Sequence, residues 1–376
     1  MNNTEKNKSS IKNILIIAAQ EEGRMPGQRF RIEQYFKFLN EQNFKCNLSP
    51  LFNSKEVKIL YSQGQFIKKI LLIIKSIFIR YKDLKKVKKG HYDLIYIYRD
   101  ALLIKSIFFE KKFKKTNIPI VYDFDDAIWL PDVSDANKKF AWLKNPNKTK
   151  KIIELSDLII TGNKYLANYA KQFNKNTIII PTTVNTEQYK ASDKTKDNNK
   201  PVVIGWLGSL TTIKHLKTVL PALKRLKQKY QDKIDFSFIG DGNFFDHDLD
   251  VSGKWWNPET ELKDLSKFDI GIMPLPDDKW SKGKCGLKGL LYMSISIPAI
   301  ISPVGVNVEI IDDGINGMLA STEDEWIEKI SMLIDSEELR KTLGEAGRKT
   351  VIEKYSFEAQ KENWLNAFQS LTDADK

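Results

Sequence analysis

The chain has 376 residues, of which 41% are hydrophobic and 11% aromatic, and its net charge is +12 at pH 7. This size suits two globular domains with cores of their own, and no apolar run approaches the roughly eighteen residues that cross a bilayer. Two cysteines and three histidines exclude a disulfide framework and a histidine-cysteine zinc cluster. Because residues 1–10 lack the apolar core of a signal peptide, we expect a cytoplasmic protein.

The first half of the chain alternates short apolar segments with helical ones. An apolar strand predicted over 11–19 opens into a glycine turn at 23–27, and a helix is predicted over 31–42. Further strands are predicted over 93–98, 118–122, 158–161 and 177–180. The alternation indicates a doubly wound α/β domain with a parallel sheet, which we assign to residues 1–190.

Residues 55–89 form a basic amphipathic segment of this domain. Eleven lysines and arginines stand against Glu56 and Asp83 only, with isoleucine, leucine and phenylalanine between them. This pattern suits a helix at an anionic membrane surface better than a nucleic-acid surface, where exposed arginine and stacking aromatics are typical. It equally suits a surface helix that packs its apolar face on the domain. We expect no nucleic-acid partner.

Three carboxylates follow the strand predicted over 118–122. Asp123, Asp125 and Asp126 are too close together to ionise cheaply without cations, hydrogen-bond donors or a raised pKa. The cluster therefore implies a polar ligand or a buried arginine, with capping of the next helix in a surface loop as the less favoured alternative. The candidate cationic partners are Arg29, Arg31 and Arg99.

The α/β pattern repeats after a polar, strand-free stretch at 191–200, which we interpret as a linker. Strands are predicted over 202–207, 234–239, 269–273, 299–302 and 317–319, with helices over about 214–230 and around Lys288, Asp324 and Ser336. Residues 201–355 therefore form a second domain of the same class. Two such domains make a cleft, and the loops at the carboxyl ends of their strands would line it.

The stretch Gly283–Met293 is the strongest predicted anion site. Glycines free backbone N–H groups to approach a ligand, and the helix that starts there directs its positive end to the same place. Lys284 and Lys288, four residues apart around Cys285 and Gly286, would repel each other on one helical face unless an anion lay between them. A diphosphate fits this pattern, and a helix start with two solvated lysines is the alternative.

Two other loops of the second domain carry polar groups. The hydroxyls of Ser209 and Thr211 and the cation of Lys214 follow Gly208 just before a helix, an arrangement that binds phosphate oxygens or simply caps the helix. Gly240-Asp241-Gly242 would let a base or ribose approach the backbone, or forms a plain turn. Of Trp255 and Trp256, at least one is expected to pack in the core.

At this point the chain resembles the family-four glycosyltransferases, retaining enzymes of the GT-B architecture that use nucleotide-activated sugars. The resemblance covers nearly the whole length, through the segments 26–31, 121–129, 181–185, 205–209, 274–278, 283–293, 302–307 and 313–317. It implies that the second domain binds a nucleotide-sugar donor and the first an acceptor. It also implies that the final helix, within 356–376, packs back on the first domain.

The resemblance assigns roles to individual residues. Asp123, Asp125 and Asp126 would orient acceptor or donor hydroxyls, and the lysines would stabilise charge on the leaving diphosphate. Donor contacts are expected from Asn307 and Glu309 besides the loop residues above, and acceptor or phosphate contacts from Gly27, Arg29, Arg31 and Arg99. The nucleotide-sugar is then a co-substrate, and neither a metal nor another cofactor is expected.

Four positions depart from the family pattern. The family places a glutamate on each side of the glycine-rich loop, one for the sugar and one for the ribose, and this chain has Gly283 and Leu291 there. An arginine that follows the glycine of the first donor loop is Ser209 here, and a histidine at the end of the fourth strand is Asp125.

The predicted function is transfer of a sugar from a nucleotide-sugar to an envelope glycan or lipid-linked acceptor, with retention. Residues 55–89 would hold the protein peripherally on the inner face of the cell membrane. Two alternatives stay open: a sugar-nucleotide epimerase or hydrolase on the same fold, and a catalytically idle nucleotide-binding partner protein. The linkage, the sugar and the nucleotide are not predicted.

Overall fold

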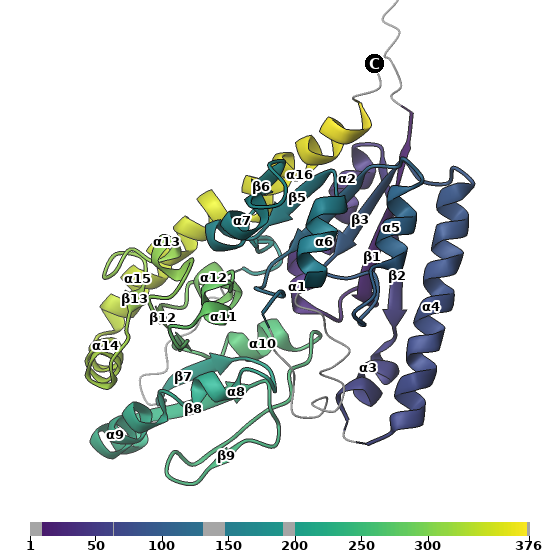
Figure 1. Ribbon diagram of the computed structural model, residues 1–376. Helices are drawn as coiled ribbons and strands as arrows, with labels where there is room; N and C mark the ends of the chain where they lie inside the picture. Colours follow the sequence, from purple (N-terminus) through teal and green to yellow (C-terminus); the bar gives the residue numbers. More distant parts are fainter. Residues whose placement is uncertain (1–9, 63, 131–146, 191–199, 374–376) are drawn as a thin grey trace, which may run out of the picture.

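A computed structural model describes residues 10–62, 64–130, 147–190 and 200–373 (Figure 1). The predicted linker therefore lies almost entirely outside the described residues, as do the two ends of the chain. The described residues form two parallel sheets, each with helices packed on it. Within these ranges, no helix is both long and apolar enough to cross a bilayer.

The first sheet has six parallel strands in the order β2-β1-β3-β4-β5-β6. Its strands are β1 (Lys12–Gln20), β2 (Phe44–Phe52), β3 (Leu94–Tyr98), β4 (Ile120–Phe124), β5 (Leu158–Thr161) and β6 (Thr177–Ile179). Its helices are α1 (Pro26–Arg31), α2 (Phe36–Glu41), α3 (Ser54–Tyr61), α4 (Phe66–Lys88), α5 (Phe108–Lys114), α6 (Asn147–Leu155) and α7 (Lys164–Lys171).

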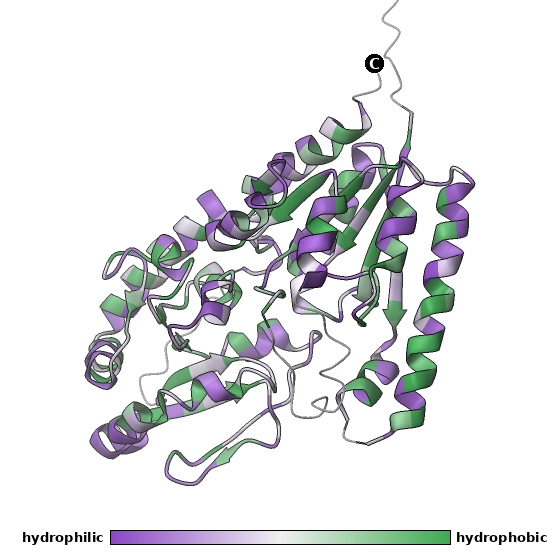
Figure 2. Cartoon of the chain, in the orientation of Figure 1, coloured by the Kyte–Doolittle hydropathy of each residue, from purple (hydrophilic) through white to green (hydrophobic). Residues whose placement is uncertain are grey.

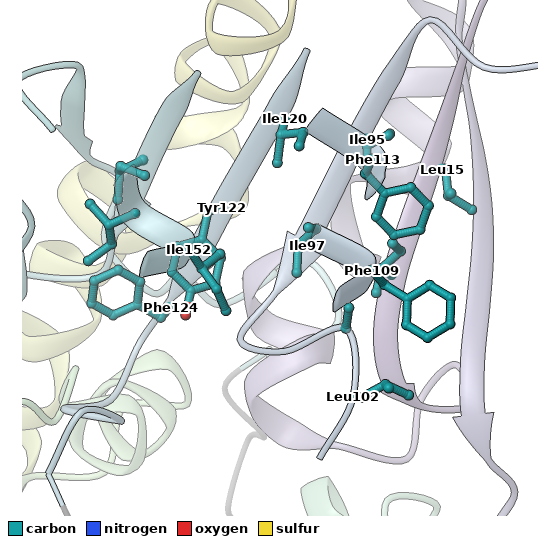
Figure 3. Packing of buried hydrophobic residues seen from close by; sticks show 14 of the residues in the cluster. Leu15, Ile95, Ile97, Leu102, Phe109, Phe113, Ile120, Tyr122, Phe124 and Ile152 are labelled. Carbon is teal, nitrogen blue, oxygen red and sulfur yellow. The ribbon is translucent and has the colours of Figure 1, made fainter. Parts of the chain in front are cut away.

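Alternation along the strands gives this sheet two buried faces. Leu15 and Ile17 of β1 point to one face, where they pack in a cluster with Phe109 and Phe113 of α5 (Figure 3). Ile14 and Ile16 point to the other face. Such period-two burial on both sides is what a parallel sheet between two helical layers requires.

The helix α16 (Phe357–Thr372) covers part of that second face. Its side chains Trp364 and Phe368 are fully buried against strands of the first sheet, and Trp364 lies 5.5 Å, centroid to centroid, from Tyr35. A bridge between Val184 and Ser356 leads the chain into this helix. The last helix thus returns from the second domain and packs on the first (Figure 1).

The second sheet has five parallel strands in the order β13-β12-β11-β7-β8. They are β7 (Val202–Leu207), β8 (Ile234–Ile239), β11 (Ile270–Met273), β12 (Ala299–Ile301) and β13 (Met318–Leu319), and a small hairpin adds β9 (Phe245–Asp246) and β10 (Val251–Ser252). The helices are α8 (Ile213–Leu216), α9 (Leu220–Tyr230), α10 (Glu261–Leu265), α11 (Lys279–Lys282), α12 (Leu287–Ser294), α13 (Asn307–Ile310), α14 (Glu323–Asp335) and α15 (Glu337–Thr350), followed by a π-helical turn at Val351–Tyr355.

The sequence prediction did not include the hairpin of β9 and β10, and it differs from the structure at one edge strand and two helices. The edge strand β2 was not predicted, because Lys45, Asn47, Ser49 and Pro50 interrupt its apolar pattern, and proline is tolerated at a sheet edge. The helix expected over 31–42 starts earlier and divides into α1, a 3₁₀ turn and α2. The helix expected over 214–230 divides into α8 and α9, and Pro221 lies in the first turn of α9.

Candidate functional site

The loops at the carboxyl ends of the two sheets face each other where the domains meet (Figure 1). Lys284 Nζ lies 2.8 Å from Asp126 Oδ1, and the Asn163 side-chain amide donates to the Lys284 carbonyl oxygen at 3.0 Å. At the surface, Lys164 Nζ lies 2.9 Å from Glu309 Oε2. The glycine-rich loop of the second domain is therefore held directly against the acidic cluster of the first.

The glycine-rich loop joins α11 to α12. Gly286 precedes α12 with a φ of +70°, a left-handed conformation that favours glycine, and a Cβ there would come within 2.3 Å of the Ile310 side chain. Because α12 begins at Leu287, Lys284 lies in the turn before the helix rather than on a shared helical face with Lys288. The expectation that both lysines lie on one helical face is thus wrong, although both side chains line the same pocket.

Both lysines line one pocket at the carboxyl ends of β7 and β11. Strand ends and loops together build its wall, through Trp206, Thr212, His215, Met273, Pro274, Leu275, Lys284 and Lys288. Apolar side chains thus stand beside two cations and a histidine. The enclosed space between them is about 10 Å³, so these side chains offer contacts for the apolar or planar part and the anionic part of a ligand rather than a cavity already shaped to hold it.

The charges of this pocket are unbalanced. Burial, together with the charge of Lys284, lowers the pKa of Lys288 to about 8. Burial alone would raise the pKa of Asp126, but attraction to Lys284 and then to Arg99 outweighs it, and the pKa of Asp126 is lowered. Asp126 therefore acts as the anion that the two lysines require when no ligand is present.

His215 is a site residue that the sequence did not single out. Burial, followed by the charges of Lys214, Lys284 and Lys288, lowers the pKa of its imidazole to about 4. The ring is therefore neutral at physiological pH, and its Nδ1 has no hydrogen-bond partner among the described residues. A neutral ring with a free nitrogen beside two cations can accept or donate one hydrogen bond to a ligand. The only sequence signal was a lone histidine beside Lys214.

The hydroxyl-rich loop after β7 lies next to the pocket. Thr212 Oγ1 accepts from Ser209 N at 2.8 Å, and the Ser209 and Thr211 hydroxyls lie 3.1 Å apart. These contacts tie the loop residues to one another, and Thr212, the residue before α8, makes no side-chain hydrogen bond to the first N–H groups of that helix, so the capping alternative is not realised. Lys214 is exposed at the start of α8, while Gly208 is half-buried.

The glycine after β8 brings a second loop against this one. A Cβ on Gly240 would lie 2.5 Å from the Gly208 carbonyl carbon, so only glycine lets the two loops touch. Asp241 Oδ1 accepts from Asn243 N at 2.9 Å, which makes the segment an Asx-type turn. Trp255 is half exposed beside Gly242, whereas Trp256 is partly buried and packs in the core.

Three predicted donor residues face away from this pocket. Asn307 is fully buried, and its amide donates to the Ser302 carbonyl at 2.9 Å. Glu309 is directed to Lys164 at the surface. Cys285 packs against Gly162, and its thiol lies 3.2 Å from the Asp125 carbonyl oxygen. The side chain is buried, and this burial raises the pKa of the thiol. In this structure each of them has a role in folding or in the contact between domains.

The structure reassigns Arg31 and Asp123. Both side chains are fully buried, and the guanidinium binds both carboxylate oxygens, at 2.7 Å and 3.1 Å. Tyr96 adds a hydrogen bond to Asp123 at 2.5 Å, and Arg31 also donates to the Ile180 carbonyl. The buried arginine that the acidic cluster implied is therefore present. Neither partner has surface left for an acceptor, so the predicted ligand roles of Arg31 and Asp123 are corrected to a structural one.

Asp125 and Asp126 remain at the junction of the domains. Arg99 Nη2 lies 2.7 Å from Asp125 and 2.5 Å from Asp126, and Tyr98 donates to Asp125 at 2.7 Å. Arg99 has a φ of +62°, a strained conformation for a side chain of its size. Gly27 completes the group, because a Cβ there would lie 2.9 Å from Asp125 Oδ2. Gly27, Arg99, Asp125 and Asp126 are thus the predicted acceptor and catalytic residues that the structure brings together.

Arg29 is directed to the second domain. Its guanidinium forms an ion pair with Glu261 of α10 and donates to the Tyr189 hydroxyl at 2.9 Å. The predicted phosphate role of Arg29 is thus replaced, in this structure, by a contact between the domains.

The structure explains the departures at Gly283 and Leu291. A Cβ on Gly283 would lie 2.7 to 2.8 Å from the Cβ and backbone nitrogen of Ala127, so a glutamate does not fit between the domains as they stand. Leu291 is 99% buried in the core of the second domain. Neither position can supply a polar side-chain contact to a sugar or a ribose.

Among the described residues, no group of three or more histidine, cysteine, aspartate or glutamate side chains is arranged to hold a metal ion.

Sequence comparisons relate the second domain to a known group. Residues 201–336 match the family described as "Glycosyl transferases group 1". A stretch of 232 residues, 58% of the chain, is 31% identical to an uncharacterised glycosyltransferase of Methanocaldococcus jannaschii. The matched stretch spans about three fifths, 61%, of that curated relative.

Solved structures relate the whole fold. The chain is similar to a sucrose-phosphate synthase from Thermosynechococcus elongatus (TM-score 0.69, 13% identity, covering 96% of this chain and 100% of that one). It is also similar to a glycosyltransferase from Rickettsia africae (TM-score 0.66, 15% identity, 96% and 99% covered). A third match is the Anabaena protein HepE in complex with UDP-glucose (TM-score 0.64, 15% identity, 96% and 100% covered). The two facing Rossmann-like sheets are thus the GT-B architecture, as the sequence predicted.

Proposed function

We propose that this protein is a glycosyltransferase that takes a sugar from a nucleotide-sugar donor. The observation that carries the proposal is the convergence of Lys284 and Lys288 on one pocket at the carboxyl ends of β7 and β11. That pocket lies in the segment that matches the family. It is also the place where an open α/β sheet binds its ligand.

The donor diphosphate would take the position between the two lysines. Departure of the diphosphate develops negative charge, and the ammonium groups stabilise it in a site that is partly closed to water. The neutral His215 offers its free nitrogen to the donor. The HepE structure with UDP-glucose makes uridine diphosphate sugars the first donors to test.

The acceptor would enter from the first domain. Asp125 and Asp126 stand at the end of β4, facing the glycine-rich loop, and their carboxylates are held by Arg99 and Tyr98. We propose that Asp125 orients an acceptor or sugar hydroxyl. Retention at the anomeric carbon, family-four membership, and the absence of a metal or another cofactor are parts of the same proposal. They draw on the resemblance of the motifs.

We further propose an envelope glycan or a lipid-linked glycan as acceptor and a peripheral position at the inner membrane face. The support is the basic amphipathic segment, which lies in the domain that would bind the acceptor.

The test is a panel of nucleotide-sugars, incubated with the purified protein with and without a chelator. We expect one sugar nucleotide to raise the melting temperature, and the nucleoside diphosphate to be released with an acceptor, equally in both conditions. Release without any acceptor would favour the epimerase or hydrolase alternative. Loss of release on chelation would contradict the metal-free mechanism.

The absence of the two family glutamates, at Gly283 and Leu291, favours one rival function, that of a catalytically idle nucleotide-binding partner. A thermal shift without turnover across acceptors would support that rival. Asp125→Ala further separates a transferase from an idle nucleotide-binding partner, because in a transferase it should abolish transfer while nucleotide affinity changes little. Unchanged transfer in that variant would return the acidic cluster to a purely structural role.

A further inference from the structure

The helix α4 presents apolar side chains directly away from the protein. Ile67, Leu71, Ile74 and Phe78 are 74%, 57%, 44% and 65% exposed, although they are large and apolar. Their spacing of three and four residues places them in one line along the helix. Figure 2 shows this helix as the outermost element beside β2, with hydrophobic turns along its N-terminal half. We call this line the apolar stripe.

The stripe is not the packing face of α4. The helix buries Leu72, Ser76, Arg80, Asp83 and Val87, which lie on the opposite side. The packing alternative for the basic segment is therefore satisfied by other residues. Large apolar side chains are unfavourable in water, and a contiguous line of them marks an interaction site, so the exposure of the stripe calls for a partner.

Lysines flank the stripe. Lys68, Lys82 and Lys86 are exposed one step round the helix, and Lys85 lies in line with the stripe at its C-terminal end. Lys75 lies in the same row, but its ammonium group is paired with Glu56 of α3 at 2.6 Å. The helix has one acidic residue, Asp83, which is buried and bound to Arg80 at 2.7 Å. The exposed charges of α4 are thus all positive. Lysine and arginine beside an apolar face are the pattern of helices that lie in a membrane interface.

The charge pattern also selects among partners. A second copy of the chain would bring the same lysine rows together, which costs free energy by repulsion. An anionic bilayer instead neutralises the lysines and accepts the apolar side chains between its headgroups. Tyr61 and Phe66, also more than half exposed at the start of the helix, add aromatic contacts of the kind found at membrane interfaces.

We propose that the apolar stripe of α4, with its flanking lysines, binds the surface of an anionic lipid bilayer. The proposal rests on the peripheral position proposed above and deepens it by naming the surface and the lipid charge, and flotation tests it without the transfer reaction. The chain passes from the carboxyl end of β2 through α3 into α4, so the apolar half of α4 begins beside that edge of the sheet (Figure 1). A bilayer bound there lies near the loops of the proposed acceptor site.

The test is flotation of the full chain with vesicles of phosphatidylcholine, alone or mixed with phosphatidylglycerol. We expect flotation only with the anionic vesicles, and weaker flotation at high salt. The variant Ile67→Ser/Leu71→Ser/Ile74→Ser/Phe78→Ser should lower the partition coefficient roughly a hundredfold, because partial burial of four apolar side chains is lost. Lys82→Gln/Lys85→Gln/Lys86→Gln should remove the preference for anionic lipid.

The matched control is Phe245→Ser/Ile315→Ser, which removes two side chains that are 63% and 60% exposed on the second domain. It should float like the wild type. Thermal melting checks that each variant is folded, and the single Phe78→Ser change serves if the fourfold variant is not. Three results would overturn the proposal: no flotation of the wild type, unchanged flotation of the stripe variants, or a wild-type dimer that the stripe variants convert to monomer.

Discussion

The two clusters of charge near the domain junction are built on opposite principles. In the first domain, Arg31 and Asp123 satisfy each other with two hydrogen bonds, and Tyr96 supplies a third to the carboxylate. In the second domain, Lys284 and Lys288 stand together beside His215, and the pKa values of Lys288 and His215 are lowered. A charge cluster that is complete without a ligand stabilises the fold. One that remains unbalanced is prepared for a ligand.

The largest expected effect comes from breaking the complete cluster. Arg31→Met leaves the Asp123 carboxylate buried without its cation, which should lower the free energy of unfolding by about 3–5 kcal/mol. Urea unfolding measures this loss. Nucleotide affinity of the folded fraction should stay unchanged, because Arg31 has no exposed surface.

The exposed ion pair between Lys164 and Glu309 is the matched control for that prediction. Lys164→Met removes an ion pair of similar length whose partners are largely solvated, so the free energy of unfolding should change by less than about 1 kcal/mol. Equal losses in both variants would show that Arg31 is not special, and the contrast between the clusters would fail.

The next effect tests the unbalanced cluster. Lys284→Met and Lys288→Met should each weaken binding of the nucleoside diphosphate by about tenfold to a hundredfold, because each removes a charge-assisted contact to phosphate. Binding of the parent nucleoside should change much less. Calorimetric titration with both ligands measures the difference.

Lys282→Met is the control from the same loop. Lys282 is 44% exposed and pairs with Asp277 at 3.0 Å, outside the pocket lining. It should leave both affinities unchanged. If the two pocket variants weakened nucleoside and diphosphate equally, the lysines would support the pocket's shape rather than bind the diphosphate.

The lowered pKa of Lys288 predicts a pH dependence. Below about pH 7 the Lys288 ammonium is almost fully charged, so it adds no pH dependence to diphosphate binding there. Above it, binding must first take up a proton, and the affinity should fall by about tenfold between pH 7 and pH 9. Lys288→Arg keeps its charge throughout this range and should flatten the curve. A curve of the same slope in that variant would assign the titration to another group.

The sequence predicted the architecture well because buried parallel strands leave a strong apolar pattern. It missed β2, an edge strand with Pro50 and three polar residues, because an exposed edge does not need that pattern. For the site, glycine and lysine spacing identified the loop of Lys284 and Lys288. Spacing does not tell which side of the chain a side chain faces. Asp123 lies on β4 and Asp125 just after its end, only two residues apart. Asp123 is nevertheless sealed in the core, whereas Asp125 lies at the domain junction.

His215 and the contact between the domains were beyond sequence reasoning for a related reason. His215 becomes distinctive only because α8 places it near Lys214, its neighbour in sequence, and near Lys284 and Lys288, which are distant in sequence. The role of Asp126 likewise depends on a residue 158 positions away. Pairings over such separations follow from the relative position of two domains, which no local pattern encodes.

The smallest expected effect tests whether Asp126 stands in for the ligand. Asp126 Oδ1 lies 2.8 Å from Lys284 Nζ, so a diphosphate must share or displace this carboxylate. Asp126→Asn removes the competing charge at constant size and should raise affinity for the nucleoside diphosphate by about threefold to tenfold, as the loss of one partly screened interaction predicts. Asp277→Asn, next to Lys282, should have no effect. If Asp126→Asn weakened binding instead, the carboxylate would serve to hold Lys284 in place for the ligand. The lysine cluster would then be partly complete without a ligand, like the pair of Arg31 and Asp123, and the contrast between the two clusters would weaken.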